Sequence, residues 1–347
     1  MKYNNYLGCH YLERFNLVLM GLMDGERFVT LCVEPFYRDD VPGVPLGDSA
    51  KETLGNLIKL RNNIISEMMN DIADSQRVYT KGSTKCMLRS RDNWRENNLI
   101  EVVIIGMYPA PCQSKCPHCI FINDIIYHGG LTDETRENYE KALDLIEYAV
   151  SNGYIREDAL WQLSSGEIAI HPYKDRILKL VGDNSCLFLT NCMKYDKGIA
   201  KNLAANPKSR ICLTIDAGTP ETHIIVKCVD NFDSVIETLY KYKRDSRPGQ
   251  IDLRYIIFPG VNDSVGNFEG ILSIMRDLEI NKLSLLRDSR KKYNTPQGEM
   301  EKVIKALAKW AALLEKNGMT CNFFYMYPEQ EEQIVAMAKE LIASGKV

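Results

Sequence analysis

Three cysteines with metal-ligand spacing stand close together in the chain. They are Cys112, Cys116 and Cys119, in the pattern C-x3-C-x2-C. Such close spacing lets one loop bring three thiolates to an iron–sulfur cluster and leaves one iron without a protein ligand. A cluster with an open iron can bind and polarise a further molecule, whereas a fully ligated cluster only transfers electrons. The motif therefore points to cluster chemistry with a vacant coordination position.

Zinc is the alternative metal for this motif. Structural zinc usually takes four protein ligands, often in paired C-x2-C units, and no second pair lies nearby. Zinc deaminases need a glutamate two residues after their first ligand, and Ser114 stands at that position. A three-ligand catalytic zinc and an accidental group of thiols stay open as alternatives, but the spacing favours the iron–sulfur cluster.

The elements around the motif alternate between strands and helices. Residues 99–106 form a nearly continuous apolar run, typical of a strand buried on both faces. Further strands are predicted at 159–163, 185–190, 211–215, 253–258, 283–286 and 321–325. Helices are predicted at 132–150, 174–181, 196–205, 232–242, 268–278, 299–315 and 329–343. This alternation predicts an α/β fold with a parallel sheet, arranged as a partial (β/α)6 barrel whose site lies where strands end.

The chain divides into three parts in this interpretation. Residues 1–98 are expected to form a small N-terminal α+β unit, with two strands around the turn Met23-Asp24-Gly25 and a helix over 49–72. Residues 99–290 form the partial barrel. Residues 291–347 form a helical C-terminal extension that packs on the barrel.

The position of the cysteines resembles a known family. C-x3-C-x2-C directly after the first strand of an α/β barrel is the signature of the radical S-adenosylmethionine (SAM) enzymes, and the resemblance covers roughly residues 99–290. It implies the radical SAM barrel, with a 4Fe-4S cluster on Cys112, Cys116 and Cys119 and SAM at the open iron. It also implies reductive cleavage of SAM to a 5′-deoxyadenosyl radical that abstracts hydrogen from a substrate. The residue before the third cysteine lies near the adenine in this family, and here it is His118.

The resemblance extends to the loop after the second strand. Ser165-Gly166-Glu167 is similar to the family's G-G-E-P segment, whose backbone receives the methionine amino group. The chain departs from that segment by Ser165 for the first glycine and by Ile168 for the proline. Gly166 permits close approach of a backbone, and Glu167 can accept from an ammonium. A plain strand-to-helix turn is the alternative.

Later strand ends carry further residues that the resemblance assigns to SAM. Asn191 matches the family's T-N pair, and Thr214 and Asp216 match its S-x-D segment, so all three could bind ribose hydroxyls. Capping of the next helix is the alternative for each, and it is preferred for Thr219. Arg254, inside an apolar strand, needs a carboxylate partner, which is either the methionine carboxylate or a structural salt bridge.

Three more cysteines lie in polar surroundings before the barrel. Cys9, Cys32 and Cys86 make residues 1–98 look like the auxiliary-cluster unit called SPASM or twitch, which usually follows the barrel in its family. The resemblance implies a possible second iron–sulfur cluster. No paired C-x2-C accompanies these cysteines, and incidental thiols in a small α+β unit are the alternative.

Net charge, apolar stretches and the cysteine count indicate which classes of protein the sequence does not fit. The net charge of −3 gives no broad basic field, so a nucleic-acid partner is not expected. No stretch of the sequence is apolar and long enough to cross a bilayer, and the first residues do not resemble a signal peptide. An odd count of 11 cysteines argues against a secreted disulfide framework. A cytoplasmic protein without a membrane partner is expected.

The resemblance implies partners as well as cofactors. A flavodoxin- or ferredoxin-type donor would reduce the cluster, and the auxiliary unit suggests a peptide or protein substrate. A sugar or nucleotide-derived metabolite is the alternative substrate class. The alternative function is a non-catalytic iron–sulfur electron-transfer protein or a zinc-binding protein.

Overall fold

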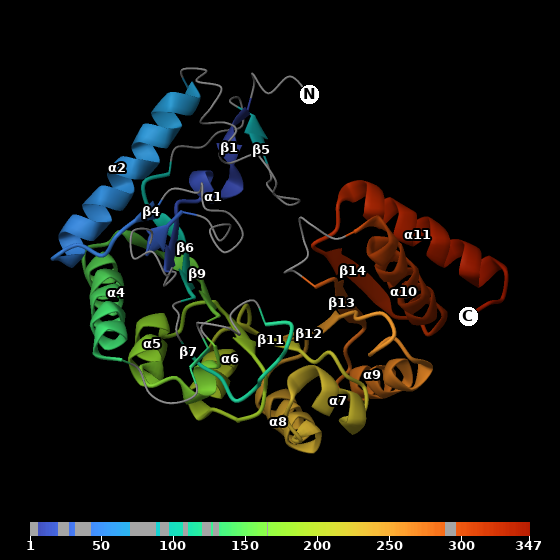
Figure 1. Ribbon diagram of the computed structural model, residues 1–347. Coiled ribbons are helices and arrows are strands. Elements are labelled where there is room, and N and C mark those ends of the chain that lie inside the picture. Colours follow the sequence, from blue (N-terminus) through green and yellow to red (C-terminus); the bar gives the residue numbers. More distant parts are fainter. Residues whose placement is uncertain are drawn as a thin grey trace. The chain divides into compact units, whose positions relative to one another are not determined.

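The computed structural model describes most of the chain in two compact units. The described residues are 6–19, 28–31, 43–69, 88–90, 97–106, 110–119, 126–127, 132–164, 166–288 and 296–347. The first unit comprises residues 1–111 and 125–187, and the second comprises 112–124 and 188–347. Figure 1 labels the elements of both units.

The first unit is built on a mixed set of parallel and antiparallel strands. Their order is β9 (Ile155–Leu163), β6 (Ile100–Ile105), β2 (Asn16–Leu19), β3 (Val29–Thr30) and β4 (Gly43–Val44). β6 lies between two parallel neighbours, β2 and β9, while β2–β3 and β3–β4 are antiparallel. β6 has the sequence Ile-Glu-Val-Val-Ile-Ile and is almost wholly buried, as expected for β-branched residues in a central strand.

Two short strand pairs accompany this sheet in the first unit. β1 (Tyr6–Cys9) pairs in antiparallel fashion with β5 (Leu88–Ser90). β7 (Ala110–Pro111) pairs in parallel with β8 (Ile126–Tyr127). β7 ends at the residue before Cys112, so the chain enters the cysteine loop from a short strand.

The helices of the first unit begin and end at recognisable signals. They are α1 (His10–Glu13), α2 (Ala50–Met69), α4 (Asp133–Ser151), the 3-10 turn η4 (Ile168–Ile170) and α5 (Lys174–Val181). Thr132 caps α4 by accepting from Thr135 N at 3.2 Å, and Gly153 follows its end with a φ of 71°. α2 and α4 lie side by side (Figure 1).

The second unit carries four parallel strands in sequential order. They are β11 (Arg210–Thr214), β12 (Ile251–Ile256), β13 (Lys282–Leu286) and β14 (Thr320–Phe324). β10 (Cys186–Thr190) contains the boundary between the units. Because parallel strands align side chains of one face in rows, residues that pair across β11 to β14 point to the same side.

Helices pack on the strands of the second unit. They are α6 (Lys197–Ala205), α7 (Pro220–Lys227), α8 (Phe232–Asp245), α9 (Val265–Asp277), α10 (Gln297–Lys316) and α11 (Pro328–Ala343). Trp310 of α10 is fully buried, with its ring 4.3 Å from that of Tyr255 and 5.4 Å, edge to face, from that of Phe268. This aromatic group joins α9 and α10 to β12 in the core of the second unit.

The architecture confirms the predicted α/β class. Each strand and helix that the sequence predicts after residue 98 is present, and α5 has the predicted bounds. β7 and β8, and α7 (Pro220–Lys227), are additional elements without a predicted range. Within the described ranges, the strands of neither unit close on themselves. The predicted strands flanking the N-terminal turn are present as β2 and β3, while the turn at 23–25 lies outside the described residues.

The parallel pairing of β2 with β6 is a finding that the local pattern does not predict. It joins residues 16–19 to the first predicted barrel strand in one sheet. The three-part division at residues 98 and 290 stays a prediction, because compact units group residues by their contacts and not by their function.

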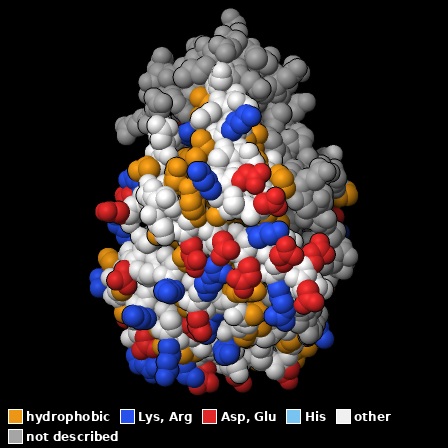
Figure 2. Space-filling model, turned by 90° about the vertical axis from the view of Figure 1, so that its left-hand side faces the viewer, with side chains coloured by type: hydrophobic (Ala, Val, Ile, Leu, Met, Phe, Trp, Pro, Cys, Tyr) orange, Lys and Arg blue, Asp and Glu red, His pale blue; other side chains and the backbone are white. Residues whose placement is uncertain are grey.

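The described helices and one face of the molecule can be compared with the hydropathy and charge of the sequence. Among the described helices, none combines the length and apolar character needed to cross a bilayer. On the face in Figure 2, Lys and Arg side chains are interspersed with Asp and Glu side chains. This mixture agrees with the small net charge of −3.

Candidate functional site

The cysteine loop, residues 112–119, lies wholly within the second unit. The side chains of Cys112, Cys116 and Cys119 are all half-buried. A backbone hydrogen bond of 3.0 Å from Cys119 N to Cys116 O closes a turn between the second and third cysteines. One short loop therefore presents three half-buried cysteines.

Asn191 contacts the start of this loop. It follows β10, and its Nδ2 donates to Cys112 Sγ at 3.6 Å and to Gln113 Oε1 at 3.1 Å. Its Oδ1 accepts from Met193 N at 3.0 Å, which fixes the orientation of the amide. The amide hydrogen therefore points at the sulfur of the first cysteine. The predicted contact of Asn191 with a ribose stays a prediction.

A buried ion pair lies between a strand end and a helix end of the second unit. Asp216 follows β11, and Lys227 is the last residue of α7. Lys227 Nζ donates to Asp216 Oδ2 at 2.5 Å and to the Thr214 carbonyl at 2.7 Å. The side chain of Asp216 is 0% exposed and that of Lys227 is 7% exposed. Two opposite charges are thus held away from water.

Each member of the pair keeps the other charged. Burial alone would raise the pKa of Asp216, but Lys227 and His118 lower it to about 2. Burial alone would lower the pKa of Lys227, but the Asp216 carboxylate raises it above its ordinary value. Cys116 and Cys112 raise it further. At neutral pH the pair is a carboxylate and an ammonium.

The ion pair is connected to the cysteine loop on both sides. His118 Nε2 lies 3.4 Å from Asp216 Oδ2, and its ring lies 4.7 Å from that of Phe258. Lys115 N donates to the Lys227 carbonyl at 3.0 Å. The loop is therefore held by one side-chain contact to Asp216 and one backbone hydrogen bond to the end of α7. The predicted place of His118 near an adenine stays a prediction.

The same pair acts on the second cysteine through charge. Burial raises the pKa of the Cys116 thiol, and the Lys227 ammonium opposes this increase. Asp216 acts in the opposite direction to Lys227 but more weakly. The field of the pair at Cys116 is therefore positive, which favours negative charge at this end of the loop.

The backbone at Asp216 is held rigidly. Asp216 has a φ of 55°, a left-handed conformation that costs a non-glycine residue about 1 kcal/mol or more. Its Oδ1 accepts from Ile256 N at 2.7 Å, and its carbonyl accepts from Asn262 Nδ2 at 2.9 Å. Asn262 is fully buried and also accepts from Phe258 N at 2.7 Å. These bonds fix the direction in which the carboxylate points.

Thr214 and Arg254 share one face of the parallel strands. They pair across β11 and β12, and Arg254 pairs with Ser284 of β13. The Arg254 guanidinium lies 5.4 Å from the centre of the Phe324 ring. Among the residues that the structure describes, no carboxylate forms an ion pair with Arg254. The predicted contact of Arg254 with a methionine carboxylate stays a prediction, as does the contact of Thr214 with ribose.

The loop after β9 belongs to the first unit and is tightly packed. Gly166 has a φ of +51°, and a Cβ there would lie 2.4 Å from the Pro111 carbonyl oxygen. Glu167 N donates to that oxygen at 2.7 Å, and the Glu167 carboxylate accepts from Ala169 N at 3.0 Å. Glu167 is fully buried and caps η4. Ser165 lies outside the described residues, and the predicted roles of this loop toward SAM stay predictions.

The predicted auxiliary cluster falls largely on residues that are not described. Cys32 and Cys86 lie outside the described ranges, and only the backbone of Cys9 is described, in β1. The second cluster stays a prediction.

The described residues fit a cluster on Cys112, Cys116 and Cys119. Within these residues, no three His, Cys, Asp or Glu side chains converge to hold a single metal ion. Each thiolate of a 4Fe-4S cluster binds a different iron, so its ligands need not converge on one point. A cluster with three thiolates is anionic, and the neighbouring Lys227 ammonium and Asn191 amide suit such a group.

Sequence reasoning did not identify Lys227 and Asn262 as members of the site. Lys227 follows an apolar run, Ile224-Ile225-Val226, in the sequence. Its contact with Asp216 forms only in the folded protein, because the two residues lie on different elements. Asn262 stands in a turn after β12, where its type suggests only a loop residue. The one available signal was a lysine at the end of an otherwise apolar helix face.

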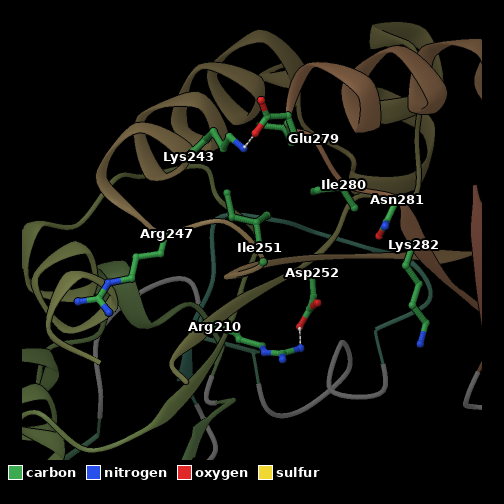
Figure 3. A pocket seen from close by; sticks show the side chains of 11 residues that line it. Arg210, Lys243, Arg247, Ile251, Asp252, Glu279, Ile280, Asn281 and Lys282 are labelled. Carbon is green, nitrogen blue, oxygen red and sulfur yellow. Dashed lines mark hydrogen bonds and ion pairs between the residues drawn. The ribbon is translucent and has the colours of Figure 1, made fainter. Parts of the chain in front are cut away.

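A pocket lies at the other end of the strands from Asp216. It has a volume of about 290 Å³ and is lined by Arg210, Ile251, Asp252 and Lys282 at the starts of β11, β12 and β13. Figure 3 shows two ion pairs in it, Arg210–Asp252 at 3.6 Å and Lys243–Glu279 at 2.6 Å. These pairs are partly exposed to solvent, so the pocket holds compensated surface charges and does not include the cysteine loop.

Comparisons with known proteins give matches only at the level of structure. No family model and no curated protein matches the chain. Solved structures that resemble it include radical SAM enzymes. SuiB of Streptococcus suis bound to S-adenosylmethionine aligns with a TM-score of 0.48 and 12% identity, over 79% of this chain and 55% of that chain.

Two further structures have similar or lower TM-scores. SuiB of Streptococcus suis bound to the precursor peptide SuiA aligns with a TM-score of 0.47 and 13% identity, over 83% of this chain and 56% of that chain. A radical SAM methyltransferase from Sphaerobacter thermophilus aligns with a TM-score of 0.41 and 14% identity, over 68% of this chain and 71% of that one. The chain thus spans just over half the length of SuiB.

Proposed function

We propose that this protein is a radical SAM enzyme in which Cys112, Cys116 and Cys119 hold a 4Fe-4S cluster. The observation that carries the proposal is the cysteine loop itself, which presents three half-buried thiols in one unit beside a buried ammonium. Such a cluster, when bound with an open iron, supplies the electron for reductive cleavage of SAM to a 5′-deoxyadenosyl radical, which then abstracts hydrogen.

The chain's own residues would bind and orient SAM. Arg254 offers a guanidinium that pairs with no described carboxylate, which suits a ligand carboxylate. Thr214 stands beside it on the same face of the sheet and can donate to or accept from a hydroxyl. His118, next to Phe258, offers an aromatic surface for a base. The backbone at Gly166 and Glu167 is the proposed partner of the methionine amino group.

Electron supply and substrate complete the proposal. The partly exposed cysteines suit an external one-electron donor of the flavodoxin or ferredoxin type. A peptide or protein is the proposed substrate class, with a sugar or nucleotide-derived metabolite as the alternative.

Formation of 5′-deoxyadenosine tests this function directly. The protein is reconstituted with iron and sulfide without oxygen, reduced with dithionite and incubated with SAM. Wild-type protein is expected to release 5′-deoxyadenosine and methionine, while a C112A/C116A/C119A variant releases neither. Cluster-loaded wild-type protein that yields no 5′-deoxyadenosine would contradict the proposal and favour a non-catalytic electron-transfer protein. Zinc in place of iron would contradict it as well.

A further inference from the structure

Lys227 is placed where its charge reaches the cysteine loop. Its Nζ is held by Asp216 Oδ2 at 2.5 Å and by the Thr214 carbonyl at 2.7 Å, so the ammonium has a fixed position. Its own carbonyl accepts from Lys115 N at 3.0 Å, which ties the end of α7 to the middle of the loop. The loop and the ammonium therefore belong to one rigid arrangement.

The two charges of the pair act on the loop with opposite sign. Lys227 Nζ contacts the same Asp216 oxygen, Oδ2, that lies 3.4 Å from His118 Nε2 of the loop. Both charges therefore lie beside the cysteines, where the ammonium attracts negative charge and the carboxylate repels it. Lys227 also interacts electrostatically with Cys112. Both charges are buried, so solvent and salt screen them poorly.

We propose that Lys227 is a positioning residue that raises the reduction potential of the cluster on Cys112, Cys116 and Cys119, with Asp216 limiting that effect. The inference rests on the proposed function, because it presumes the cluster. Reduction adds one electron to the cluster, and a fixed positive charge nearby stabilises the added negative charge. Net charge and burial around a cluster are two of the factors that set its potential.

Opposite substitutions of the pair separate this role from a structural one. Lys227→Met removes the positive charge, so the potential is expected to fall whether Asp216 stays ionised or gains a proton. Asp216→Asn removes the negative charge, and the anionic cluster beside Lys227 still favours its protonated form, so the potential is expected to rise. Both variants break the same ion pair, so a purely structural effect would move the potential in the same direction in both.

The experiment is a redox titration of reconstituted protein without SAM, followed by the electron paramagnetic resonance signal of the reduced cluster. Dithionite supplies the electron. Lys227→Met is expected to lower the equilibrium constant for reduction at least tenfold, which is 59 mV for a one-electron couple. Asp216→Asn is expected to shift the potential upward. Lys227→Arg keeps the charge and is expected to stay close to wild type.

Lys243→Met is the matched control. It removes a lysine of the same unit that pairs with Glu279 at 2.6 Å, in the pocket away from the cysteine loop (Figure 3). Its potential is expected to equal that of wild type.

The outcomes distinguish the inference from the function. Opposite shifts in Lys227→Met and Asp216→Asn, with no shift in Lys243→Met, support it. Equal potentials in all variants, or shifts of the same sign, overturn it while leaving the proposed function intact. If Lys227→Met holds no cluster, the direction of the shift in Asp216→Asn decides. Wild-type protein that binds no cluster overturns the proposed function itself.

Discussion

Two acidic residues at strand ends, one in each unit, look alike in the sequence and differ in the structure. Glu167 follows β9 in the first unit, and Asp216 follows β11 in the second. Both are fully buried. Glu167 accepts from the neutral N–H of Ala169 two residues away, whereas Asp216 accepts from the Lys227 ammonium. The first carboxylate completes a local turn, and the second anchors a buried positive charge.

The difference lies in how far each carboxylate's influence extends. A cap acts on the turn that it closes, so Glu167 organises a segment of a few residues. An ion pair in a low-dielectric interior acts over a longer range, so Asp216 and Lys227 also influence the sulfur atoms of the cysteine loop. Position at a strand end therefore does not define the role of an acidic residue, but its partner does.

Removing the Asp216 charge is expected to have the largest effect on stability. Asp216→Asn leaves the buried Lys227 ammonium without a counter-charge, which costs about 3–5 kcal/mol. Denaturant unfolding of the cluster-free protein at neutral pH measures this loss.

The double variant Asp216→Asn/Lys227→Met is the control. It removes both charges and is expected to recover most of the lost stability, since no buried charge remains. If Asp216→Asn is as stable as wild type, the Asp216 carboxylate is not needed to compensate the buried Lys227 ammonium.

The stability of the first unit is expected to depend on pH through the buried, neutral imidazole of His171. His171 follows η4, and burial lowers its pKa to about 4. In the unfolded chain the imidazole binds a proton near pH 6.5, but the folded state resists protonation until about pH 4. The contribution of the neutral His171 to the free energy of unfolding is therefore fully present above pH 6.5. It falls by about 3 kcal/mol on acidification to pH 4.

His171→Asn tests this response. Asparagine keeps an acceptor for Tyr173 N, which donates to His171 Nδ1 at 3.2 Å, but cannot bind a proton. The variant is expected to lose about 3 kcal/mol less than wild type between pH 7 and pH 4 in denaturant unfolding. Equal losses in the two proteins would refute the assignment to His171.

The contribution of the Asp216–Lys227 pair to stability is not expected to change with pH near neutrality. The folded-state pKa of Asp216 is lowered to about 2, so its contribution is present above its unfolded value near 4 and is lost only as the pH falls toward 2. The raised pKa of Lys227 means that its contribution is lost only in strongly alkaline solution.

Removing the Glu167 carboxylate is expected to have the smallest effect. Glu167→Ala loses the cap of η4, a cost of about 1–2 kcal/mol. Glu167→Gln keeps an acceptor for Ala169 N and is expected to lose less. Denaturant unfolding measures the cost, and the cluster potential is expected to stay unchanged in both. A shift of the cluster's reduction potential in Glu167→Gln would show that the Glu167 carboxylate also acts on the cluster, as Asp216 is proposed to do.

Local signals in the sequence predicted much of the fold. Thr219 caps α7 by accepting from Thr222 N at 3.3 Å, as its type and place predict. Gly153 takes the left-handed conformation expected after a helix end. β6 is buried as its apolar run predicts. Each of these features depends on residues within one or two turns of the chain, where type and spacing determine the structure.

Long-range pairings could not be predicted in the same way. The parallel pairing of β2 with β6 joins distant segments whose patterns fit several partners. The inward charge of Lys227 depends on how α7 packs beside β11, and the direction of the Asn191 amide depends on the cysteine loop. The sequence predicted which loops carry polar residues, but not which of those residues bind one another.

The most direct test of the central claim is the response of the reduced cluster to SAM. Reconstituted wild-type protein is expected to bind about four irons at Cys112, Cys116 and Cys119. Its electron paramagnetic resonance spectrum should change when SAM is added, because SAM binds the open iron. C112A/C116A/C119A reports separately on Cys9, Cys32 and Cys86, since iron retained there would support a second cluster. A wild-type spectrum that SAM leaves unchanged, or wild-type protein without iron, would contradict the account.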